Sequence, residues 1–196
     1  MMNYPKIQQL KDKLCFSGAD VARALDIAPA SAWVTCSRYV RKGIFLRLKK
    51  DFYVLDQRWL ALTQQDFFKI SNLLQVPSYV SLMTALSFYG VTDQVQKNFF
   101  ENISWKRSVS FKGEGADFYF YKMKRELYFD FVRQNDVFIA TKEKALVDAL
   151  YLYSFGKYAV DLSSLDVGKL DKGKIQRILK VFPLKTRRIA GEICGI

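Results

Sequence analysis

Apolar residues recur every three or four positions through the first 42 residues, a spacing typical of short helices. The first predicted helix would bury Ile7, Leu10 and Leu14. A second would begin after Ser17, whose side chain can accept a hydrogen bond from the backbone of the first turn. It would run through Leu25 and be broken at residues 26–29, because Pro29 disfavours helical geometry at Ala28.

A third helix is predicted from Ala30 to Lys42, because Gly43 suits the left-handed residue that often follows a helix. Its inward face would carry Ala32, Cys36, Tyr39 and Val40. Its outward face would carry Ser31, Val34, Thr35, Arg38, Arg41 and Lys42. Two helices joined by a short turn, the second richer in cations, indicate a helix-turn-helix.

Two short apolar strands are predicted next, at residues 44–48 and 52–55, with cations in the turn between them. The stretch from the end of the helix to this turn has six basic residues and no acidic one: Arg38, Arg41, Lys42, Arg47, Lys49 and Lys50. A helix followed by a basic hairpin is how a winged helix meets DNA. A like-charged run on adjacent elements is also costly without a partner, although any single lysine could belong to an ordinary solvated hairpin.

The residues that we expect to contact DNA are Ser31, Thr35, Arg38, Arg41, Lys42, Arg47, Lys49 and Lys50. Ser31, Thr35 and Arg38 would read base edges, because residues near the start of a recognition helix usually do. Arg41 and Lys42 would meet the backbone. The three hairpin cations would lie along a minor groove or a phosphate ridge. Trp33 is interpreted as a partly buried packing residue, with a DNA contact as the alternative.

A polar connector at residues 56–58 follows the second strand, so we place a domain boundary there. Residues 1–58 are predicted to form a winged helix-turn-helix. Residues 59–196 are predicted to form a mixed domain of helices and a small antiparallel sheet, which makes the fold class α+β.

The second domain begins with helical patterns and continues with strands. Thr63 would cap one helix, with a buried stripe of Phe67, Ile70, Leu73 and Leu74. Ser78 would cap another that runs to Tyr89 and ends at Gly90. Residues 98–140 are aromatic and partly alternating, which predicts three or four antiparallel strands with a turn at residues 112–115. Thr141 would then cap a further helix.

The last part of the chain is strongly basic. Two or three helices fit from Leu162 onward, broken around Gly173 and Pro183, and an apolar stripe predicts an amphipathic helix with a cationic face. The expected second basic surface comprises Lys172, Lys174, Arg177, Lys180, Lys185, Arg187 and Arg188. It could extend the DNA footprint, hold an acidic protein, or be solvated.

Composition narrows the classes of protein. The net charge of +12 and the pI of about 9.6 favour a polyanionic partner, and 50% apolar residues suffice for a folded core. The chain has no histidine, and its three cysteines lack metal-ligand spacing, so we expect no metal site and no cofactor. No apolar stretch could span a membrane and no signal core is present, so a cytoplasmic protein with reduced thiols is expected.

Catalysis is not expected. Carboxylates that a metal-dependent nuclease could use are present in the β-rich region, but no nuclease motif, phosphate loop or nucleophile elbow surrounds them. They are Asp117, Glu126, Asp130 and Asp136. A third class, a regulator whose aromatic strands line a small-molecule pocket, is compatible with 16 Phe and 11 Tyr. A packed aromatic core is the commoner use of such residues.

Three segments together resemble the AbiEi family of antitoxins, from type IV toxin–antitoxin and phage-defence systems. The first is FSGADVARALDIAPASAWVTCSRYVRKGIFLRLKKDFYVL, which is similar to the family's winged-helix start. The others are PSYVSLMTALSFYG (77–90), similar to a Ser-Tyr-x-Ser…Ala-Leu…Gly stretch, and TKEKALVDALY (141–151), similar to a Glu-Lys-Ala-Leu-x-Asp motif. Members often carry His before the glycine, where this chain has Phe88-Tyr89-Gly90.

The resemblance implies a transcriptional autorepressor that binds inverted repeats at its own promoter through the N-terminal domain. It also implies that the C-terminal domain opposes a nucleotidyltransferase toxin, AbiEii, without a stable complex. The oligomeric state stays open, with a monomer that pairs on DNA as one arrangement. From the residues alone, capping and packing on the polar edges of helices would suffice to explain the motif residues Ser78, Tyr79, Ser81, Glu143, Lys144 and Asp148.

Overall fold

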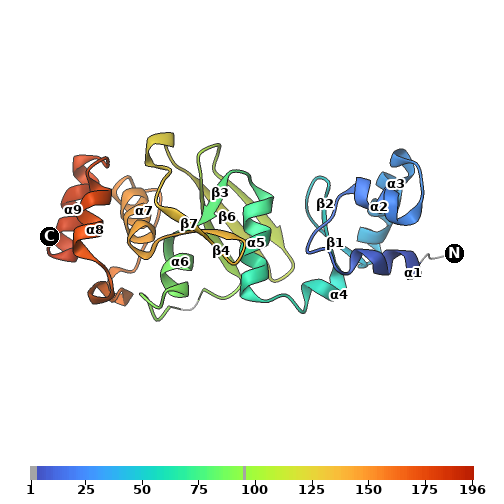
Figure 1. Cartoon of the computed structure of the whole chain (residues 1–196), viewed down its shortest axis with the longest axis horizontal. Helices are drawn as coiled ribbons and strands as arrows, with labels where there is room; N and C mark the ends of the chain where they lie inside the picture. The colour runs from blue at the N-terminus through green and yellow to red at the C-terminus, as the bar shows by residue number, and fades with distance from the viewer. Residues whose placement is uncertain (1–3, 95) are drawn as a thin grey trace.

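The computed structural model describes residues 4–94 and 96–196 and shows a mixed α+β fold. The molecule is elongated, with the first helices at one end, a sheet in the middle and the last two helices at the other end (Figure 1). The N-terminal elements are α1 (Tyr4–Ile7), a 3₁₀ turn (Gln8–Leu10), α2 (Gly18–Leu25), α3 (Pro29–Arg41), β1 (Phe45–Lys49) and β2 (Phe52–Leu55).

The N-terminal elements surround a small core of their own. Phe16, Tyr39 and Tyr53 pack around Phe45, whose ring lies 4.8 Å from that of Phe16 and 5.1 Å from that of Tyr39. β1 and β2 form an antiparallel pair. Phe16 and Tyr53 exchange two backbone hydrogen bonds of 2.9 Å, so the segment before α2 joins the pair through an isolated antiparallel bridge.

Local signals position both helices of this unit. Ser17 and Asp20 form a reciprocal capping box at the start of α2, as expected from Ser17. α3 begins at Pro29, one residue earlier than predicted, because proline without an N–H is tolerated in the first turn. It ends before Gly43, whose φ is 67° and which lets the Ile44 N–H reach the Tyr39 carbonyl.

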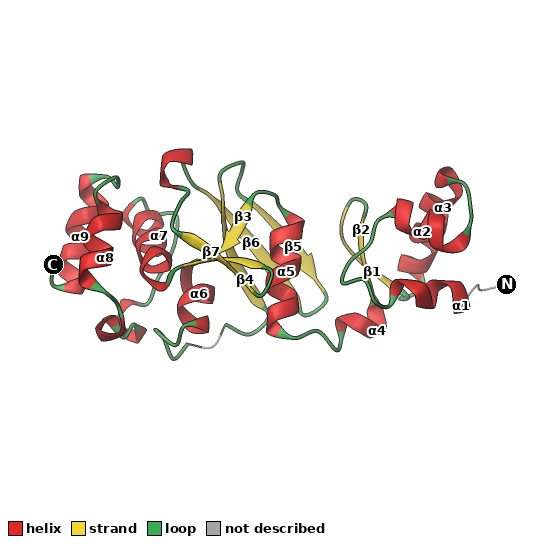
Figure 2. Ribbon diagram, in the orientation of Figure 1, coloured by secondary structure: helices red, strands yellow, loops and turns green. Residues whose placement is uncertain are grey.

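The remaining elements form the larger part of the molecule (Figure 2). The helices are α4 (Asp56–Trp59), α5 (Gln64–Leu74), α6 (Leu82–Phe88), α7 (Lys142–Ser154), α8 (Lys172–Leu179) and α9 (Leu184–Cys194), with 3₁₀ turns at Arg125–Leu127, Leu162–Ser164 and Val167–Lys169. The strands are β3 (Ser78–Val80), β4 (Phe99–Ser104), β5 (Val109–Gly113), β6 (Ala116–Lys122), β7 (Phe131–Gln134) and β8 (Val137–Ala140). Thr63 and Thr141 cap α5 and α7 as predicted.

The strands form one six-stranded sheet in the order β5-β6-β4-β3-β8-β7. The pairs β4–β6 and β3–β8 are parallel, and the other pairs are antiparallel. The predicted antiparallel pairing is therefore found in three of the five strand pairs, and the sheet has more strands than the three or four expected. After β4 the chain forms β5 at the edge and returns through a turn at Gly115, so β6 enters between β5 and β4 and runs parallel to β4.

Ser78 does not cap a helix, which corrects another expectation. The backbone of β3 pairs with β4 on one side, where Tyr79 faces Ile103, and with β8 on the other, where Val80 faces Ile139. These partners lie more than twenty residues away in sequence, and their pairing overrides the local helical pattern. α6 begins only after Ser81.

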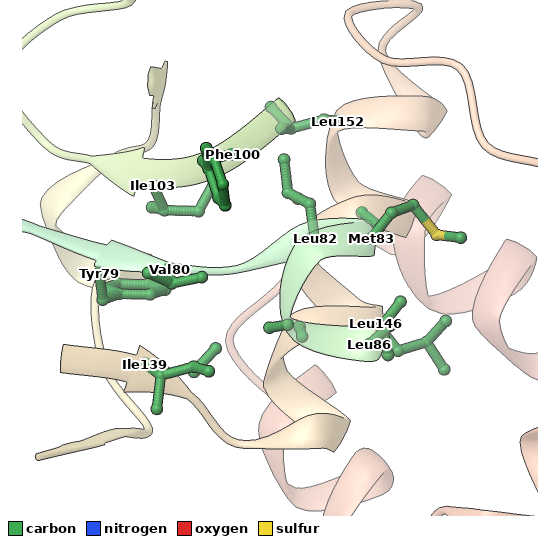
Figure 3. Close-up of a cluster of buried hydrophobic side chains, with 14 of the residues drawn as sticks. Tyr79, Val80, Leu82, Met83, Leu86, Phe100, Ile103, Ile139, Leu146 and Leu152 are labelled. Carbon is green, nitrogen blue, oxygen red and sulfur yellow. The ribbon is translucent and has the colours of Figure 1, made fainter. Parts of the chain in front are cut away.

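Helices cover the sheet and then one another. α5 packs against β3, β4 and β8, α6 lies between β4 and α7, and α8 and α9 pack on α7. Figure 3 shows how the sheet and helices meet: Leu86 of α6 lies beside Leu146 of α7, and Val80 of β3 lies between Ile103 and Ile139 of the neighbouring strands. Phe68 and Ile70 of α5 are buried, whereas Leu73 is 47% exposed, contrary to the predicted stripe.

The two C-terminal helices differ from prediction only in detail. Pro183 separates α8 from α9 as expected, but Gly173 lies within the first turn of α8 and does not interrupt it.

At the junction near residue 58, Trp59 is buried against the sheet and its indole N–H donates to the Glu114 carbonyl at 2.6 Å. None of the described helices is long and apolar enough to cross a membrane.

Candidate nucleic-acid interface

The outer face of α3 carries the polar residues that helical spacing assigned to it. Ala32 and Cys36 are fully buried on the opposite face, and Tyr39 is 8% exposed. Because these three residues fix the rotation of the helix against α2 and β1, the other face points away from the core. The exposed residues of that outer face are Ser31, Val34, Arg38, Arg41 and Lys42.

Two residues of this face differ from their expected roles. Thr35 is half-buried, and its hydroxyl donates to the Ser31 carbonyl at 2.8 Å, so its oxygen is left as an acceptor only. Val34 was not among the expected contacts, yet 56% of it is exposed between Ser31 and Arg38. Val34 comes three residues after Ser31 and four before Arg38, a spacing that places all three on one face of a helix. This spacing could have added Val34 to the expected contacts. Such an apolar side chain can contact a thymine methyl group.

The β1–β2 hairpin is held to the helices at its tip. Asp51 has a φ of 55°, and its carboxylate accepts a 2.6 Å hydrogen bond from the Gly18 N–H at the start of α2. A Cβ at Gly18 would lie only 3.2 Å from that carboxylate oxygen, so glycine suits this contact. Arg47 and Lys50 are exposed on this anchored hairpin. Their charges and those of α3 therefore belong to one rigid unit.

Lys49 does not point outward with its neighbours, which corrects its expected role. Its ammonium donates to the Leu74 carbonyl at 2.6 Å, at the end of α5, and lies 5.2 Å from the Phe52 ring centre. Partial burial there lowers the pKa of Lys49. The strand register shifts between Arg47 and Lys49, so the two side chains do not share a face. Lys49 joins the N-terminal unit to the rest of the molecule.

The remaining cations of this surface have no acidic partner. No ion pair with any residue in the described ranges neutralises Arg38, Arg41, Lys42, Arg47 or Lys50. We call these five residues the N-terminal cationic surface. Asp20, a carboxylate of the same unit, is engaged by Lys13 and Arg23. Burial alone would raise the pKa of Asp20, but hydrogen bonds from Lys13, Ser17 and Arg23 lower it well below its usual range.

The second basic surface is partly neutralised. Lys174 lies 3.5 Å from Asp130 and 3.4 Å from Glu143, so it links α8 to α7 instead of facing a partner. Arg188 pairs with Glu192 at 3.8 Å, and Lys185 lies 5.7 Å from the Phe155 ring centre. Lys172 donates weakly to the Gly195 carbonyl. Five of the seven are exposed and have no ion pair to a described residue: Lys172, Arg177, Lys180, Lys185 and Arg187.

Position also separates the two basic surfaces. α8 and α9 lie at the opposite end of the long axis from α3 (Figure 1). One short DNA site held by α3 would therefore not reach them without wrapping along the whole molecule. Of the three expected uses of the second surface, extension of the same footprint is the one that this arrangement disfavours.

A buried polar network joins two of the motifs noted in the sequence. Lys144 and Asp148, both fully buried on α7, form an ion pair, and the Asp148 carboxylate accepts 2.9 Å hydrogen bonds from Tyr79 and Ser81. Lys144 also donates to the Tyr79 hydroxyl at 3.0 Å. We call these four residues the core network. The expectation that they lie on polar helix edges was wrong, since α7 is covered on nearly every side.

Burial dominates the electrostatics of the core network. It lowers the pKa of Lys144 and raises the pKa of Asp148, and each shift is opposed by the charge of the other residue. Because all four side chains are closed to solvent, no substrate can reach them. Their arrangement fits a structural role. The i, i+4 spacing of Lys144 and Asp148 was a sequence signal for the pair, but not for its burial.

Glu101 of β4 is a second buried acid. Tyr158 donates to its carboxylate at 2.9 Å and the Met83 N–H at 3.1 Å. Burial raises the pKa of Glu101 from its ordinary 4.5 to about 7, although these hydrogen bonds oppose the shift. Glu101 therefore titrates near neutral pH while it holds α6 and the segment around Tyr158 against the sheet.

The carboxylates considered for catalysis each engage different partners. Asp130 accepts from Thr141, Asp136 pairs with Arg133, and the nearest cation to Glu126 is Lys124 at 3.9 Å. Asp117 lies 3.4 Å from the Tyr119 hydroxyl. Among the described residues, no three or more His, Cys, Asp or Glu side chains are grouped so that they could hold a metal ion.

Comparison with known proteins provides evidence on the fold alone. The chain is similar to the crystal structure of the RV2827C protein from Mycobacterium tuberculosis, with a TM-score of 0.61 and 10% sequence identity. The match covers 96% of this chain and 74% of that one. No family model matches the chain. No curated protein matches its sequence significantly.

Proposed function

We propose that residues 1–58 form a winged helix-turn-helix and that the protein binds double-stranded DNA through α3 and the β1–β2 hairpin. The observation that carries this proposal is the N-terminal cationic surface, five exposed cations with no acidic partner in the described chain. The Phe16–Tyr53 pairing and the hairpin anchored at Gly18 support it, because they are the parts that a winged helix requires beside its helix pair.

The proposed contacts follow from position on these elements. Ser31, Thr35 and Arg38 would face base edges from the outer face of α3. Arg41 and Lys42, near the end of the helix, would meet phosphate, as would the two hairpin cations. Lys49 is left out because its ammonium is held at the end of α5. Since a single such unit covers half of an inverted repeat, we propose that two copies pair on the operator.

We further propose that the protein is a cytoplasmic autorepressor and an antitoxin of the AbiEi type, which opposes a nucleotidyltransferase toxin without a stable complex. The three sequence segments described above support this. The two C-terminal motifs meet in the structure, since Tyr79 and Ser81 of one bind Asp148 of the other. They therefore act as one structural unit of the second domain and not as separate binding motifs.

A triple variant tests the DNA-binding proposal. Replacing Arg41, Arg47 and Lys50 with alanine should make the slope of log K against log salt less steep by about 2–3. Each phosphate contact releases about one counterion from the DNA on binding, and the variant makes three fewer contacts. Fluorescence anisotropy on a fragment of the protein's own promoter measures the slope. The matched control replaces Arg177, Lys180 and Arg187, which removes the same charge from the far end of the molecule.

The control should keep the wild-type slope. If both triple variants lower the slope equally, binding depends on net charge and not on the N-terminal cationic surface. If neither lowers it, DNA binding through this surface is wrong. Circular dichroism of each variant establishes that the fold is intact before the slopes are compared.

The same variant separates antitoxin activity from DNA binding. We expect the Arg41, Arg47 and Lys50 triple variant to lose repression of its own promoter and still protect cells that express the nucleotidyltransferase from the neighbouring reading frame. Loss of protection together with repression, in a folded variant, would contradict the division of labour between the two domains. If the neighbouring reading frame encodes no nucleotidyltransferase, the antitoxin proposal is wrong, while the DNA-binding proposal is unaffected.

One observation favours a second candidate, a stand-alone winged-helix regulator with a ligand-sensing C-terminal domain. An apolar cavity of about 610 Å³ lies beside α5, and Leu14 of the N-terminal unit contributes to its wall. Such a regulator would bind DNA through the same surface. It would have no nucleotidyltransferase gene beside it.

A further inference from the structure

The cavity beside α5 lies between the end of that helix, the start of β3 and the β7–β8 hairpin, which Figure 1 shows next to one another. Its volume of about 610 Å³ is in the range of small-molecule sites. The walls are mainly apolar and come from both parts of the molecule: Leu14, Leu73, Val76, Tyr128, Phe131 and Phe138.

The aromatic wall of the cavity is rigid. The Phe131 ring stacks on the buried Tyr79 ring at 4.7 Å, and its centre lies 5.1 Å from Tyr128 and 6.1 Å from Phe138. Tyr79 in turn is fixed by its hydrogen bond to Asp148. A wall held in this way can receive a flat ring without rearrangement, which reduces the entropy lost on binding.

Most polar groups around the cavity already have partners. The Asn72 side chain is bound to both the N–H and the carbonyl of Phe138, at 2.6 and 3.3 Å. Asp136 pairs with Arg133, and Lys69 is the cavity's one lining cation among the described residues, so the rim carries one charge of each sign. The site therefore favours a ligand without net charge.

Ser78 is the exception among these polar groups. Ser78 lines the cavity and is 5% exposed, and its buried hydroxyl has no hydrogen-bond partner among the described residues. A buried hydroxyl without a partner destabilises the folded protein, and a suitably placed ligand group would offset that cost. The Tyr128 hydroxyl likewise has no hydrogen bond in the described chain, and burial raises its pKa.

We propose that this cavity binds a neutral small molecule with a flat ring system and one hydroxyl or carbonyl group, the ring against Tyr128 and Phe131 and the polar group at Ser78. Apolar side chains that are exposed without a ligand would then be covered, since Leu73, Val76 and Phe138 are 47%, 59% and 42% exposed. The inference does not depend on DNA binding or on antitoxin activity, because it concerns this cavity alone.

Titration calorimetry with 2-naphthol, a flat ring system with one hydroxyl, tests the proposal on the full chain. Wild-type protein should bind one equivalent with saturation. Leu73→Trp, which fills the cavity from its exposed rim, should weaken binding at least tenfold. The matched control is Leu184→Trp on α9, an equally apolar change at a residue that is 74% exposed at the far end of the molecule. It should bind as wild type does.

Ser78→Ala refines the test, because it removes the proposed polar partner while it leaves the cavity open. We expect a weakening of about three- to tenfold, the usual value of one hydrogen bond. Unchanged affinity would overturn the role of Ser78. Absence of saturable binding by wild type, equal binding by Leu73→Trp, or a loss in Leu184→Trp instead would overturn the site. Thermal unfolding of each variant identifies any loss that comes from misfolding.

Discussion

The N-terminal unit and the larger C-terminal part place their charges in opposite ways. The outer face of α3 and the hairpin carries cations that are exposed and unpaired. Around α7 the charges are enclosed: Lys144 and Asp148 are fully buried, and Glu101 and Glu143 are 1% and 3% exposed. The chain thus separates charge that can meet a partner from charge that holds the fold.

The difference shows what each region can tolerate. An exposed lysine adds little to the free energy of folding, so evolution can place many of them for a partner. A buried charge requires an opposite charge and hydrogen bonds, because water no longer solvates it. Changes in the first region should therefore alter binding without altering stability, and changes in the second should do the reverse.

The largest effect is expected at the core network. Asp148→Ala should lower the free energy of unfolding by about 3–5 kcal/mol, because Lys144 would be left buried without its counter-charge. Urea denaturation followed by circular dichroism measures the change. The paired replacement Lys144→Met with Asp148→Leu should recover only part of that loss, since no lone charge remains but the buried Tyr79 and Ser81 hydroxyls lose their acceptor. A single variant as stable as wild type would mean that the ion pair does not hold α7 in place.

A smaller effect should appear at Glu101 as a dependence on pH. Its pKa is raised to about 7 in the folded protein, so the folded state binds this proton more tightly than the unfolded state does. The resulting stability is fully present below pH 4.5 and is lost as the pH rises through 7. Relative to Glu101→Gln, the wild type should lose about 2–3 kcal/mol over this range. Parallel pH profiles of the two proteins would contradict the raised pKa.

The smallest and most discriminating effect concerns two adjacent lysines. Lys49→Ala should cost about 1 kcal/mol of stability, because it removes the hydrogen bond to Leu74, and should leave the salt slope of DNA binding unchanged. Lys50→Ala should leave stability within about 0.5 kcal/mol and lower the slope by about 1. Denaturation and anisotropy on the same two variants provide both values. The reverse pattern would mean that Lys49 contacts DNA and that Lys50 does not.

Much of the N-terminal unit could be predicted because its signals are local. A capping serine, a proline in the first turn and a glycine after the last turn determine where α2 and α3 begin and end. Helical spacing then determines that Arg38 faces away from Cys36. The same local reasoning located the starts of α5 and α7 through Thr63 and Thr141.

The sheet could not be predicted in the same way. The helical pattern of residues 78–89 is real for α6, but Ser78 to Val80 gains strand partners on both sides from β4 and β8. Parallel pairing of β4 with β6 depends on the path of β5 between them in sequence. Hydrogen bonds between segments so far apart in sequence do not produce a periodic pattern of apolar residues in either segment.

By itself the sequence determined the α+β class, the helix ends and the exposed cations of α3, because each depends on residues within a turn or two of one another. Only the tertiary structure decided which charges are free. It turns Lys49 toward Leu74 and Lys174 toward Asp130 and Glu143, and it encloses Lys144 with Asp148. The physical reason is that a charge's surroundings are set by elements that pack against it, and packing brings together residues from distant parts of the chain.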